Sequence, residues 1–421
     1  MKFSLVLFST PVKKVLLGRP TNNLTSGIVG LANVGKSTFF QAITQSKLGN
    51  PANYPFATIE PEEARVIVPS KRLQHLSNLY QTAKPVPSTL TIYDIAGLTR
   101  GASNGEGLGN KFLNDIRHVD GIYQVVRGFM KEDITHIEGS VDPVRDLSVV
   151  QDELILKDIE YLERIRERLQ KKMNKTAKSC NDYKEMEFEM NLLNSLEEHL
   201  YGGQKIYHYK QSNGTAWTEK EVAVLNKHNF LTAKPSVILL NVSPKDYLLQ
   251  TNQFKDSVYK WIQEFSPGDP LLLFSAEFET KYNELMCTEN KAPKQLQEYC
   301  REIVDGEAIV KDIKSALPEI ITLMREKLGL ISFFTCGPLE CRQWSIRKGA
   351  TAPNAAGIIH TSLEQTFISA EIIKYSDLAA LSSPFQESSL KTNGKIKRAG
   401  KNYIMEDGDV ALFKAAKGNA R

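Results

Sequence analysis

The sequence lacks the features that would assign it to a membrane, zinc-binding or disulfide-rich class. No apolar run in its 421 residues reaches the roughly 20 residues that cross a bilayer. Its five cysteines are scattered, and no two of them have CxxC spacing. This pattern indicates neither a zinc site nor a disulfide framework. We therefore expect no membrane contact and a reducing compartment.

Acidic residues are missing from the N-terminus, where the first is Glu60. Lys2, Lys13 and Arg19 are basic in this stretch, and the composition resembles a mitochondrial transit segment. Pro11 interrupts any amphipathic helix there, which favours an ordinary lead-in to the first strand. From composition alone, the cytoplasm and the mitochondrial matrix both remain open.

The bulk composition is that of a globular protein with two or three domains. Charged residues make up 24% of the chain and apolar residues 41%, which are ordinary values. The net charge of +4 permits an anionic partner but does not require one. Any basic surface must therefore be argued from local sequence.

A phosphate-binding loop stands near the start of the chain, at residues 30–37 (GLANVGKS). It follows the apolar pair Ile28–Val29 and precedes a predicted helix that begins near Thr38. A strand, a Gly-rich turn and a helix together direct backbone N–H groups and a helix dipole at one anion. Lys36 is expected to reach the β- and γ-phosphates, and the Ser37 hydroxyl is expected to bind Mg²⁺.

Two later segments supply the remaining metal-side groups. The Pro-rich stretch 50–63 predicts a loop, and it carries Thr58, placed where nucleotide switches complete the Mg²⁺ shell. Residues 90–93 alternate like a strand that ends at Asp94, with Gly97 three residues on. This pattern predicts a carboxylate that holds Mg²⁺ through water and a Gly N–H that meets the γ-phosphate. The expected metal ligands are Ser37, Thr58 and, through water, Asp94.

The segment that should recognise the base lacks the acid that reads guanine. Residues 236–240 predict a buried strand that ends at Asn241, and 271–274 predict another that ends at Ser275-Ala276. Guanine-specific switches carry Asn-Lys-x-Asp after the first of these strands, but here residues 241–244 read Asn-Val-Ser-Pro. Without that Asp, two guanine donors would go unpaired, at about 1–3 kcal/mol each if buried. The sequence therefore argues against strict GTP specificity.

Two further regions differ in character from the nucleotide domain. From Asp146 to about Gly202 the chain is free of Pro and rich in Glu, Lys, Arg and Leu, with helical spacing on both sides of a polar break at 178–183. This pattern predicts an antiparallel, coiled-coil-like helical hairpin, either a docking arm or a solvated pair of helices. From Leu330 onwards, short alternating strands and turn signals predict a small β-rich domain.

These motifs, in this order, resemble the Obg-like ATPase (YchF) subfamily of translation-factor-related P-loop NTPases. The similarity runs from about Leu17 to Phe413. Its most specific parts are the phosphate loop with Asn33, residues 53–61 (NYPFATIEP), 94–98 (DIAGL), 105–110, 134–143 (ITHIEGSVDP) and 344–349 (WSIRKG). A segment similar to the family's at 17–19 precedes the loop, which favours an ordinary lead-in and the cytoplasm.

The resemblance implies an α/β P-loop NTPase fold, a G domain with an inserted α-helical coiled-coil hairpin and a C-terminal β-grasp TGS domain. The expected domains are a lead-in at 1–23, an OBG-type nucleotide domain at 24–145 and 204–329, the hairpin at 146–203, the TGS domain at 330–414 and a tail at 415–421. The resemblance also implies that ATP is hydrolysed in preference to GTP. The predicted nucleotide contacts are Asn33, Val34, Gly35, Lys36, Ser37, Thr38, Gly97, Asn241, Val242, Ser275 and Ala276.

Two residues depart from the usual pattern of the family. Ala32 stands where members usually have Pro, which changes loop stiffness. Pro244 stands where they usually have an acidic residue, which removes a side chain next to the base. This second departure keeps GTP hydrolysis open as an alternative.

The catalytic prediction rests on Lys36 and, by resemblance, on His136. Leu98 occupies the position of the water-orienting Gln of many switches, so we expect slow intrinsic turnover. His136 could orient the attacking water instead, or it could be a structural loop histidine. Asn33 lies where some related enzymes coordinate K⁺, which makes K⁺ a second candidate cofactor beside Mg²⁺; a structural role for Asn33 is the alternative.

The resemblance also implies partners beyond ATP or GTP. A TGS domain is associated with ribosome or RNA contact, so we expect the large ribosomal subunit or its RNA to be bound through the TGS and helical domains. Basic residues that suit such contact are Arg342, Arg347, Lys348, Lys391, Lys395, Lys397, Arg398 and Lys401. The alternative is a non-catalytic adaptor whose helical arm binds a protein. A monomer is expected.

Overall fold

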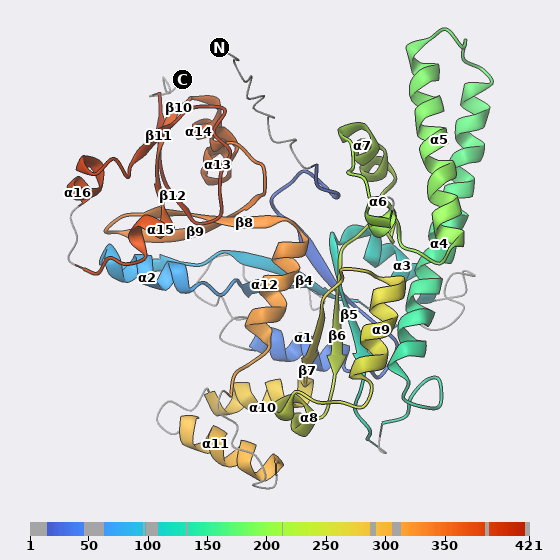
Figure 1. Ribbon diagram of the computed structural model, residues 1–421, viewed down its shortest axis with the longest axis horizontal. Coiled ribbons are helices and arrows are strands. Elements are labelled where there is room, and N and C mark those ends of the chain that lie inside the picture. Colours follow the sequence, from blue (N-terminus) through green and yellow to red (C-terminus); the bar gives the residue numbers. More distant parts are fainter. Residues whose placement is uncertain are drawn as a thin grey trace, which may run out of the picture.

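The computed structural model describes residues 15–45, 63–95, 97, 108–131, 134–212, 214–286, 292–304, 313–383 and 387–416. Their strands form two six-stranded sheets, and two long helices project from the larger body (Figure 1). Within these ranges, no helix combines the length and apolar character needed to cross a membrane.

The first sheet carries the nucleotide-binding motifs. Its strand order is β2-β4-β1-β5-β6-β7, with bounds β1 (Thr25–Val29), β2 (Glu63–Ile67), β4 (Thr89–Asp94), β5 (Gly121–Arg127), β6 (Ser236–Asn241) and β7 (Leu271–Phe274). Only β2 runs antiparallel to its neighbour. Because β1, β5 and β6 are covered on both faces, they read as near-continuous apolar runs. The strands expected at 90–93, 236–240 and 271–274 are confirmed.

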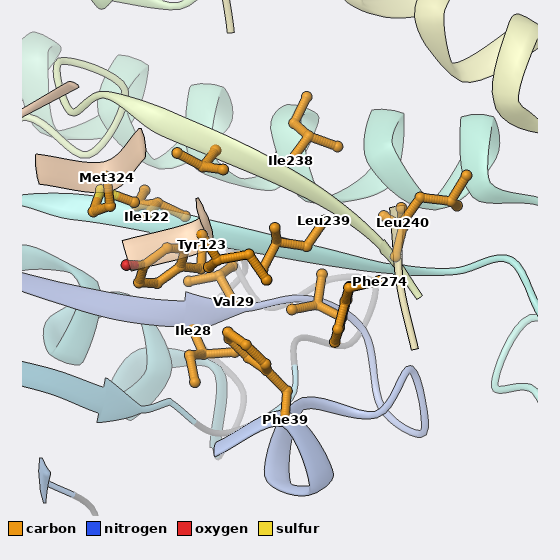
Figure 2. Packing of buried hydrophobic residues seen from close by; sticks show 14 of the residues in the cluster. Ile28, Val29, Phe39, Ile122, Tyr123, Ile238, Leu239, Leu240, Phe274 and Met324 are labelled. Atoms are coloured by element: carbon orange, nitrogen blue, oxygen red, sulfur yellow. The ribbon is translucent and has the colours of Figure 1, made fainter. Parts of the chain in front are cut away.

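Helices cover both faces of this sheet, as a doubly wound α/β fold requires. They are α1 (Lys36–Gln45), α3 (Leu108–His118), α8 (Pro244–Leu249), α9 (Lys255–Phe265), α10 (Ala276–Met286), α11 (Ala292–Ile303) and α12 (Leu317–Lys327). Figure 2 shows how Phe39 of α1 packs on Phe274 at the end of β7, with ring centroids 5.1 Å apart. Met324 of α12 lies on the other side of the strands, near Ile122. This packing fixes the strand ends from which the site is built.

The inserted arm is an antiparallel pair of helices, α4 (Pro143–Met173) and α5 (Asn181–Tyr201). Leu162, Leu193 and Leu196 are fully buried between them. Helix α4 begins at Pro143, before the expected boundary at 146, because Asp142 accepts N–H bonds from Val144 and Arg145, both at 3.1 Å. An Asp N-cap followed by Pro at the first helical position is a strong start signal.

The turn between the arm helices also differs slightly from the expected polar break at 178–183. The structure places the connection at residues 174–180, and polar Asn181 and Asp182 already lie on the exposed first turn of α5. The chain then returns through the short 3₁₀ turn Ile206–His208 and two helices, α6 (Tyr209–Ser212) and α7 (Glu219–His228). Polar residues at a helix start and in a turn look alike in sequence.

The C-terminal domain has the predicted β-grasp topology. The strand order is β11-β10-β12-β8-β9, with β3 added beside β9. The bounds are β3 (Lys84–Val86), β8 (Leu330–Cys336), β9 (Glu340–Arg347), β10 (Phe367–Lys374), β11 (Lys397–Ala399) and β12 (Asp409–Ala415). The first and last strands of the domain, β8 and β12, pair in parallel at the centre.

One face of this sheet is covered by α13 (Ala352–Ile359), whose alanines pack on Phe333. Short helices α14 (Thr361–Gln365), α15 (Tyr375–Leu378) and α16 (Glu387–Thr392) complete the domain. Since side chains alternate along a strand, Phe334 points to the opposite face, away from α13. That opposite face needs its own cover.

Helix α2 (Lys71–Leu79) covers this opposite face. The domain boundaries predicted from the sequence assigned α2 to the nucleotide domain at 24–145. Its residues Leu73, Leu76 and Leu79 form an apolar stripe buried against Phe334. Strand β3 then adds a parallel edge to the C-terminal sheet (Figure 1). Residues 71–86 thus belong structurally to the second sheet, which locks the two domains together.

Residues 17–19, in the predicted lead-in, are bonded into both domains. The Leu17 carbonyl accepts from Arg347 Nη2 (2.8 Å), and the Gly18 carbonyl accepts from Asn226 Nδ2 (3.0 Å). Arg19 Nε donates to Asp120 Oδ1 at 2.7 Å. Arg347 is therefore only 9% exposed, so the expectation that it faces a nucleic acid is wrong.

A buried carboxylate joins α10 to the start of α12. Glu279 is fully buried and accepts bonds from Ser315 Oγ (2.6 Å) and the Ala316 N–H (2.7 Å). Burial raises the pKa of Glu279 to about 7, although both hydrogen bonds oppose this rise. The folded protein therefore binds a proton here more tightly than the unfolded chain does.

We predict that Glu279→Gln stabilises the protein at pH 8 by about 1–3 kcal/mol and has little effect near pH 5. The wild-type contribution is complete below the unfolded pKa near 4.5 and is lost as the pH rises through 7. Gln can accept from Ala316 and donate to Ser315, so both contacts persist. Urea unfolding at the two pH values measures the difference; a pH-independent difference would contradict the prediction.

Candidate functional site

The phosphate loop lies between β1 and α1, and its shape depends on two glycines. A Cβ on Gly30 would lie 2.3 Å from the Val125 carbonyl oxygen, in the neighbouring strand β5. A Cβ on Gly35 would lie 2.3 Å from Asn241 Nδ2, and Gly35 has φ +99°. Asn33 also adopts the left-handed region, with φ 62°, which Asn tolerates better than most residues. The glycines thus allow the loop to pass close to two strand ends.

Lys36 points back into its own loop. Its Nζ donates to the Leu31 carbonyl at 2.7 Å, and the side chain is largely buried. Burial lowers the pKa of Lys36 to about 8, and the charge of Asp94 opposes that shift. Gly97 approaches so closely that a Cβ there would lie 3.1 Å from Lys36 Nζ. The structure therefore brings Lys36, Asp94 and Gly97 together around the loop; their predicted contacts with phosphate and Mg²⁺ stay predictions.

The residues present suit a hard divalent cation beside the loop. Ser37 is exposed on the first turn of α1, and Asp94 ends β4, the strand adjacent to β1. A hydroxyl and a carboxylate are the oxygen donors that Mg²⁺ takes beside phosphates. Thr58, the third expected ligand, and Leu98 lie outside the described residues.

Asn241 joins three strand ends through its side-chain amide. It is 3% exposed; its Nδ2 donates to the Val34 carbonyl (2.9 Å), and its Oδ1 accepts from the Ala276 N–H (3.0 Å). The Val242 N–H donates to Phe274 O at 2.8 Å. The expectation that Asn241 and the backbone near Val242 simply hold the base is thus incomplete. Both groups first hold the phosphate loop and β7 in place.

Ser275 has a similar internal role. It is fully buried, and its Oγ accepts from the Phe278 N–H at 3.3 Å at the start of α10. Ala276 is buried except where it borders the cleft. Of the two predicted contacts after β7, Ala276 therefore reaches the cleft, whereas Ser275 shapes the turn.

A cleft of about 860 Å³ extends from the loop. Its lining includes Asn33, Gly35 and Thr38 of the phosphate loop and helix α1, and the adjoining residues 241–244 at the end of β6. Its volume falls within the range of cofactor and nucleotide sites. The cleft therefore places phosphate-binding and base-binding groups along one continuous opening.

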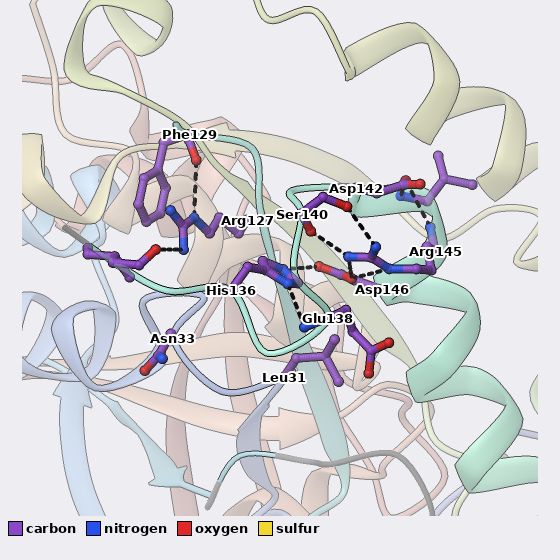
Figure 3. Close-up of polar contacts among 12 residues, drawn as sticks. Leu31, Asn33, Arg127, Phe129, His136, Glu138, Ser140, Asp142, Arg145 and Asp146 are labelled. Carbon is purple, nitrogen blue, oxygen red and sulfur yellow. Dashed lines mark hydrogen bonds and ion pairs between the residues drawn. The ribbon is translucent and has the colours of Figure 1, made fainter. Parts of the chain in front are cut away.

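One wall of the cleft is the loop after β5, and Arg127 organises it. The buried guanidinium donates to the carbonyls of Phe129 (3.1 Å), Lys131 (3.1 Å) and Ile134 (3.0 Å). It also lies over the Phe129 ring, 4.6 Å from the centroid (Figure 3). The sequence did not lead us to predict this role of Arg127, although a charged residue at the end of an apolar strand can indicate a buried, hydrogen-bonded charge.

His136 is engaged at both ring nitrogens. Nδ1 accepts from the Glu138 N–H (3.1 Å), so the neutral ring carries its proton on Nε2, which donates to Asp146 Oδ2 at 2.8 Å (Figure 3). The side chain is only 3% exposed. In this arrangement His136 anchors Asp146 of α4 and directs no nitrogen at the cleft. A catalytic role for it remains a prediction.

Asn33 connects the phosphate loop to the His136 segment. Its Nδ2 donates to the Thr135 carbonyl at 3.1 Å. This bond uses the amide nitrogen, so the amide oxygen is the atom that a K⁺ ion could meet. The exposed side chain borders the cleft. The geometry thus gives Asn33 a structural bond and is compatible with the proposed cation role.

Comparison with known proteins shows which family has this architecture. A family model described as "50S ribosome-binding GTPase" matches residues 25–173, and the YchF-type GTPase C-terminal model, described as a "Protein of unknown function", matches 330–416. An "Obg-like ATPase homolog" of Saccharomyces cerevisiae is 62% identical over 408 residues, covering 97% of this chain and 98% of that protein. The chain belongs to the YchF/Obg-like ATPase family.

Other relatives agree across the whole chain. "Obg-like ATPase 1" of Homo sapiens is 41% identical over 399 residues, covering 95% of this chain and 94% of that protein. The solved structure of the Schizosaccharomyces pombe YchF GTPase has a TM-score of 0.81 at 45% identity, covering 95% of this chain and all of that chain. This family membership and the loop geometry identify the chain as a P-loop nucleoside triphosphate hydrolase.

We predict that Gly35→Ala lowers nucleotide affinity by more than tenfold. The added Cβ would displace Asn241 Nδ2 from the loop, and it would force a left-handed backbone on Ala. Titration with a fluorescent nucleotide analogue measures the loss.

Gly394→Ala is the matched control. Gly394 also has positive φ (+67°), but its added Cβ meets nothing within 4 Å, so this variant carries the backbone strain alone. Equal affinity losses in the two variants would show that the Asn241 contact does not maintain the loop.

Proposed function

We propose that this chain is a Mg²⁺-dependent ATPase that turns over slowly, acts as a nucleotide switch and associates with ribosomes. The observation that carries the ATP preference is the missing Asn-Lys-x-Asp motif: residues 241–244, which border the cleft, read Asn-Val-Ser-Pro. The names of the relatives divide between ATPase and GTPase. The preference must therefore be argued from the residues themselves.

The charges around the loop suit phosphoryl transfer. Lys36 and the loop N–H groups neutralise the β- and γ-phosphates, and a bound phosphate would in turn raise the pKa of Lys36 from about 8. Ser37, Thr58 and, through water, Asp94 hold the Mg²⁺ ion. When bound, this ion neutralises charge that develops between the β- and γ-phosphates.

Asn241 does not discriminate between the purines. An Asn side chain has two amide hydrogens, and one donates to the Val34 carbonyl. The other can donate to N7, an atom that adenine and guanine share. Selection must therefore occur at the opposite edge of the base, near Ser243 and Pro244.

The carboxylates that border the cleft are already paired with lysines. Glu277 Oε2 lies 3.7 Å from Lys131 Nζ, and Glu284 Oε2 lies 3.0 Å from Lys281 Nζ. These lysines compete with the N1 and N2 donors of guanine for the two exposed carboxylates of the cleft. Ser243 Oγ accepts from the Asp246 N–H (3.1 Å), so its hydroxyl hydrogen remains to donate to adenine N1. This arrangement supports ATP as the substrate.

We predict that Pro244→Asp shifts the ratio of GTP to ATP affinity towards GTP by about tenfold or more. A carboxylate at this position can accept from both N1 and N2 of guanine but from only one amine of adenine, and such a pair is worth about 1–3 kcal/mol. Asp also suits the first turn of α8. Competition binding with ATP, GTP and ITP, which lacks the N2 amine, measures the ratio.

Pro244→Ala is the control, because it removes the ring without adding a carboxylate. It should leave the ratio unchanged. A wild-type protein that binds GTP more tightly than ATP would overturn the proposed substrate, and an unchanged ratio in Pro244→Asp would show that the base lies elsewhere.

The proposed ribosome contact rests on a basic edge of the C-terminal domain. The exposed members on β11 or next to it in the sequence are Lys391, Lys395, Lys397, Arg398 and Lys401, whereas exposed Lys348 follows β9 on the other side of the sheet. Lys397 and Arg398 lie on β11, the edge strand of the sheet. Arg342 Nε lies 2.9 Å from Glu340 Oε1, so Arg342 contributes less positive charge to the proposed contact. The family model described as "50S ribosome-binding GTPase" supports this partner.

We predict that Lys397→Glu combined with Arg398→Glu weakens co-sedimentation with large ribosomal subunits and flattens its dependence on salt. Phosphate contacts release counterions, so each lost contact should reduce the slope of log affinity against log salt by about one. Lys220→Glu combined with Lys260→Glu, at exposed positions of α7 and α9, is the charge-matched control. An association of the wild-type protein that is absent or insensitive to salt would contradict the proposal.

A further inference from the structure

Two cysteines face each other across the β8–β9 hairpin. Cys336 and Cys341 are directly opposite in the strand register, and their Sγ atoms are 2.9 Å apart. Cys341 is fully buried, whereas Cys336 is half-buried. Both are thiols. The scattered spacing of the cysteines along the chain does not indicate this pair.

The backbone around the pair already suits a disulfide. The Gly337 N–H donates to the Glu340 carbonyl at 3.0 Å, so the next pair inward, Cys336 and Cys341, is a non-hydrogen-bonded pair. The Cα atoms of such pairs are about 4.5 Å apart, which lies within the disulfide range of about 4.4–6.8 Å. The sulfur atoms need only move to about 2.05 Å, by side-chain rotation.

The pair lies where the two domains are joined. Both cysteines pack in the cluster that α2 forms with the C-terminal sheet. The hairpin loop between them binds the chain that leaves α2: Pro338 O accepts from the Ala83 N–H (3.1 Å), and Gly337 O accepts from Thr82 Oγ1 (3.0 Å). A change in this hairpin therefore acts directly on residues 82–86.

We propose that Cys336 and Cys341 form a redox-active dithiol that closes into an intrachain disulfide on exposure to a low-molecular-weight disulfide of the glutathione type. This site is independent of the nucleotide cleft. It adds a modification site at the joint between the two domains.

The closure balances as two thiol–disulfide exchanges. The Cys336 thiolate, the more accessible sulfur, attacks the small disulfide; a mixed disulfide forms and one small thiolate leaves, which takes up the proton that Cys336 released. The Cys341 thiolate then attacks the Cys336 sulfur, and the second small thiol leaves with the proton of Cys341. The two cysteines lose two electrons and two protons, and the small disulfide is reduced to two thiols.

The Cys336 thiol is held in its protonated form at neutral pH. The hydrogen bond with Cys341 and burial together raise the pKa of Cys336 well above its ordinary value. Since only the thiolate attacks, the first exchange is slow at pH 7 and should accelerate by about tenfold per pH unit in the alkaline direction. The pair thus responds to sustained oxidation rather than to brief exposure.

Closure should act locally. The disulfide would close a loop of only six residues (336–341), and short loops gain little entropic stabilisation from a cross-link. Its effect is to fix the hairpin that holds Thr82 and Ala83. We therefore expect slower opening of this joint without a large change in global stability.

The test uses the reduced full-length protein in glutathione buffers of increasing oxidised fraction, followed by alkylation under denaturing conditions and peptide mass spectrometry. Cys336 and Cys341 should lose alkylation together and appear as one cross-linked peptide that lacks two hydrogen atoms. Exposed Cys180 should form only a mixed disulfide with glutathione. Cys180→Ser should leave the closure unchanged, whereas Cys336→Ser should abolish the cross-linked peptide.

Two outcomes would overturn the proposed site. One is full alkylation of both cysteines under conditions that convert Cys180 to its mixed disulfide. The other is a mixed disulfide at Cys336 that persists without closure. Neither outcome bears on nucleotide hydrolysis, so the two proposals fail independently.

Hydrogen exchange then tests the effect on the joint. Oxidation should slow exchange of the Ala83 amide, which donates to Pro338 O, and leave the Ala352 amide unchanged as a control in the same domain, where it donates to Tyr403 O at 2.8 Å. Unchanged exchange at Ala83 in the disulfide form would overturn the stiffening of the joint.

Discussion

The site depends on one buried amide, the side chain of Asn241. It joins the end of β6 to the phosphate loop through the Val34 carbonyl and to the start of α10 through the Ala276 N–H. Both partners are backbone groups that would otherwise lack a bond in a water-poor interior, at a cost of about 1–3 kcal/mol each. Because Gly35 has no Cβ, Asn241 can approach this closely. The phosphate loop and the base end of the cleft are therefore one rigid unit.

Much of the fold followed from local patterns in the sequence. Apolar runs that end in Asn241 and Ser275 predicted two parallel strands of the first sheet, because strands buried on both faces have no polar alternation, whereas alternation at 90–93 predicted the strand that ends at Asp94. The start of α4 was missed by three residues because Asp142 and Pro143 were not recognised as an N-cap and first-turn pair. The placement of 71–86 could not be predicted, since an amphipathic helix shows that it buries one face but not which sheet covers that face.

Only part of the candidate site was predicted, because local patterns in the sequence do not show which distant segments meet. Residue types identified Lys36, Asp94 and Gly97, because the chemistry of phosphate binding imposes spacing along the chain. Arg127 and the Asp146 partner of His136 were missed, because their bonds depend on how a loop folds back on its own strand end. The Val242 N–H and the Ser275 hydroxyl also make internal bonds, which only the packed strand ends determine; the nucleotide contacts predicted for these two residues stay predictions.

The arm and the cleft share one loop. Asn33 of the phosphate loop donates to Thr135 O, and the next residue, His136, donates to Asp146 on the first turn of α4. The buried hydrogen bond from His136 to the Asp146 carboxylate is one to a charged group, worth about 1.5–3 kcal/mol, whereas the Asn33 bond is an exposed neutral one worth about 0.5–1.5 kcal/mol. The root of the arm should therefore stay fixed to residues 134–142, and any separation should occur first at Asn33. A γ-phosphate or cation that engages Asn33 would thus act on the weaker of the two bonds that connect the phosphate loop to the arm.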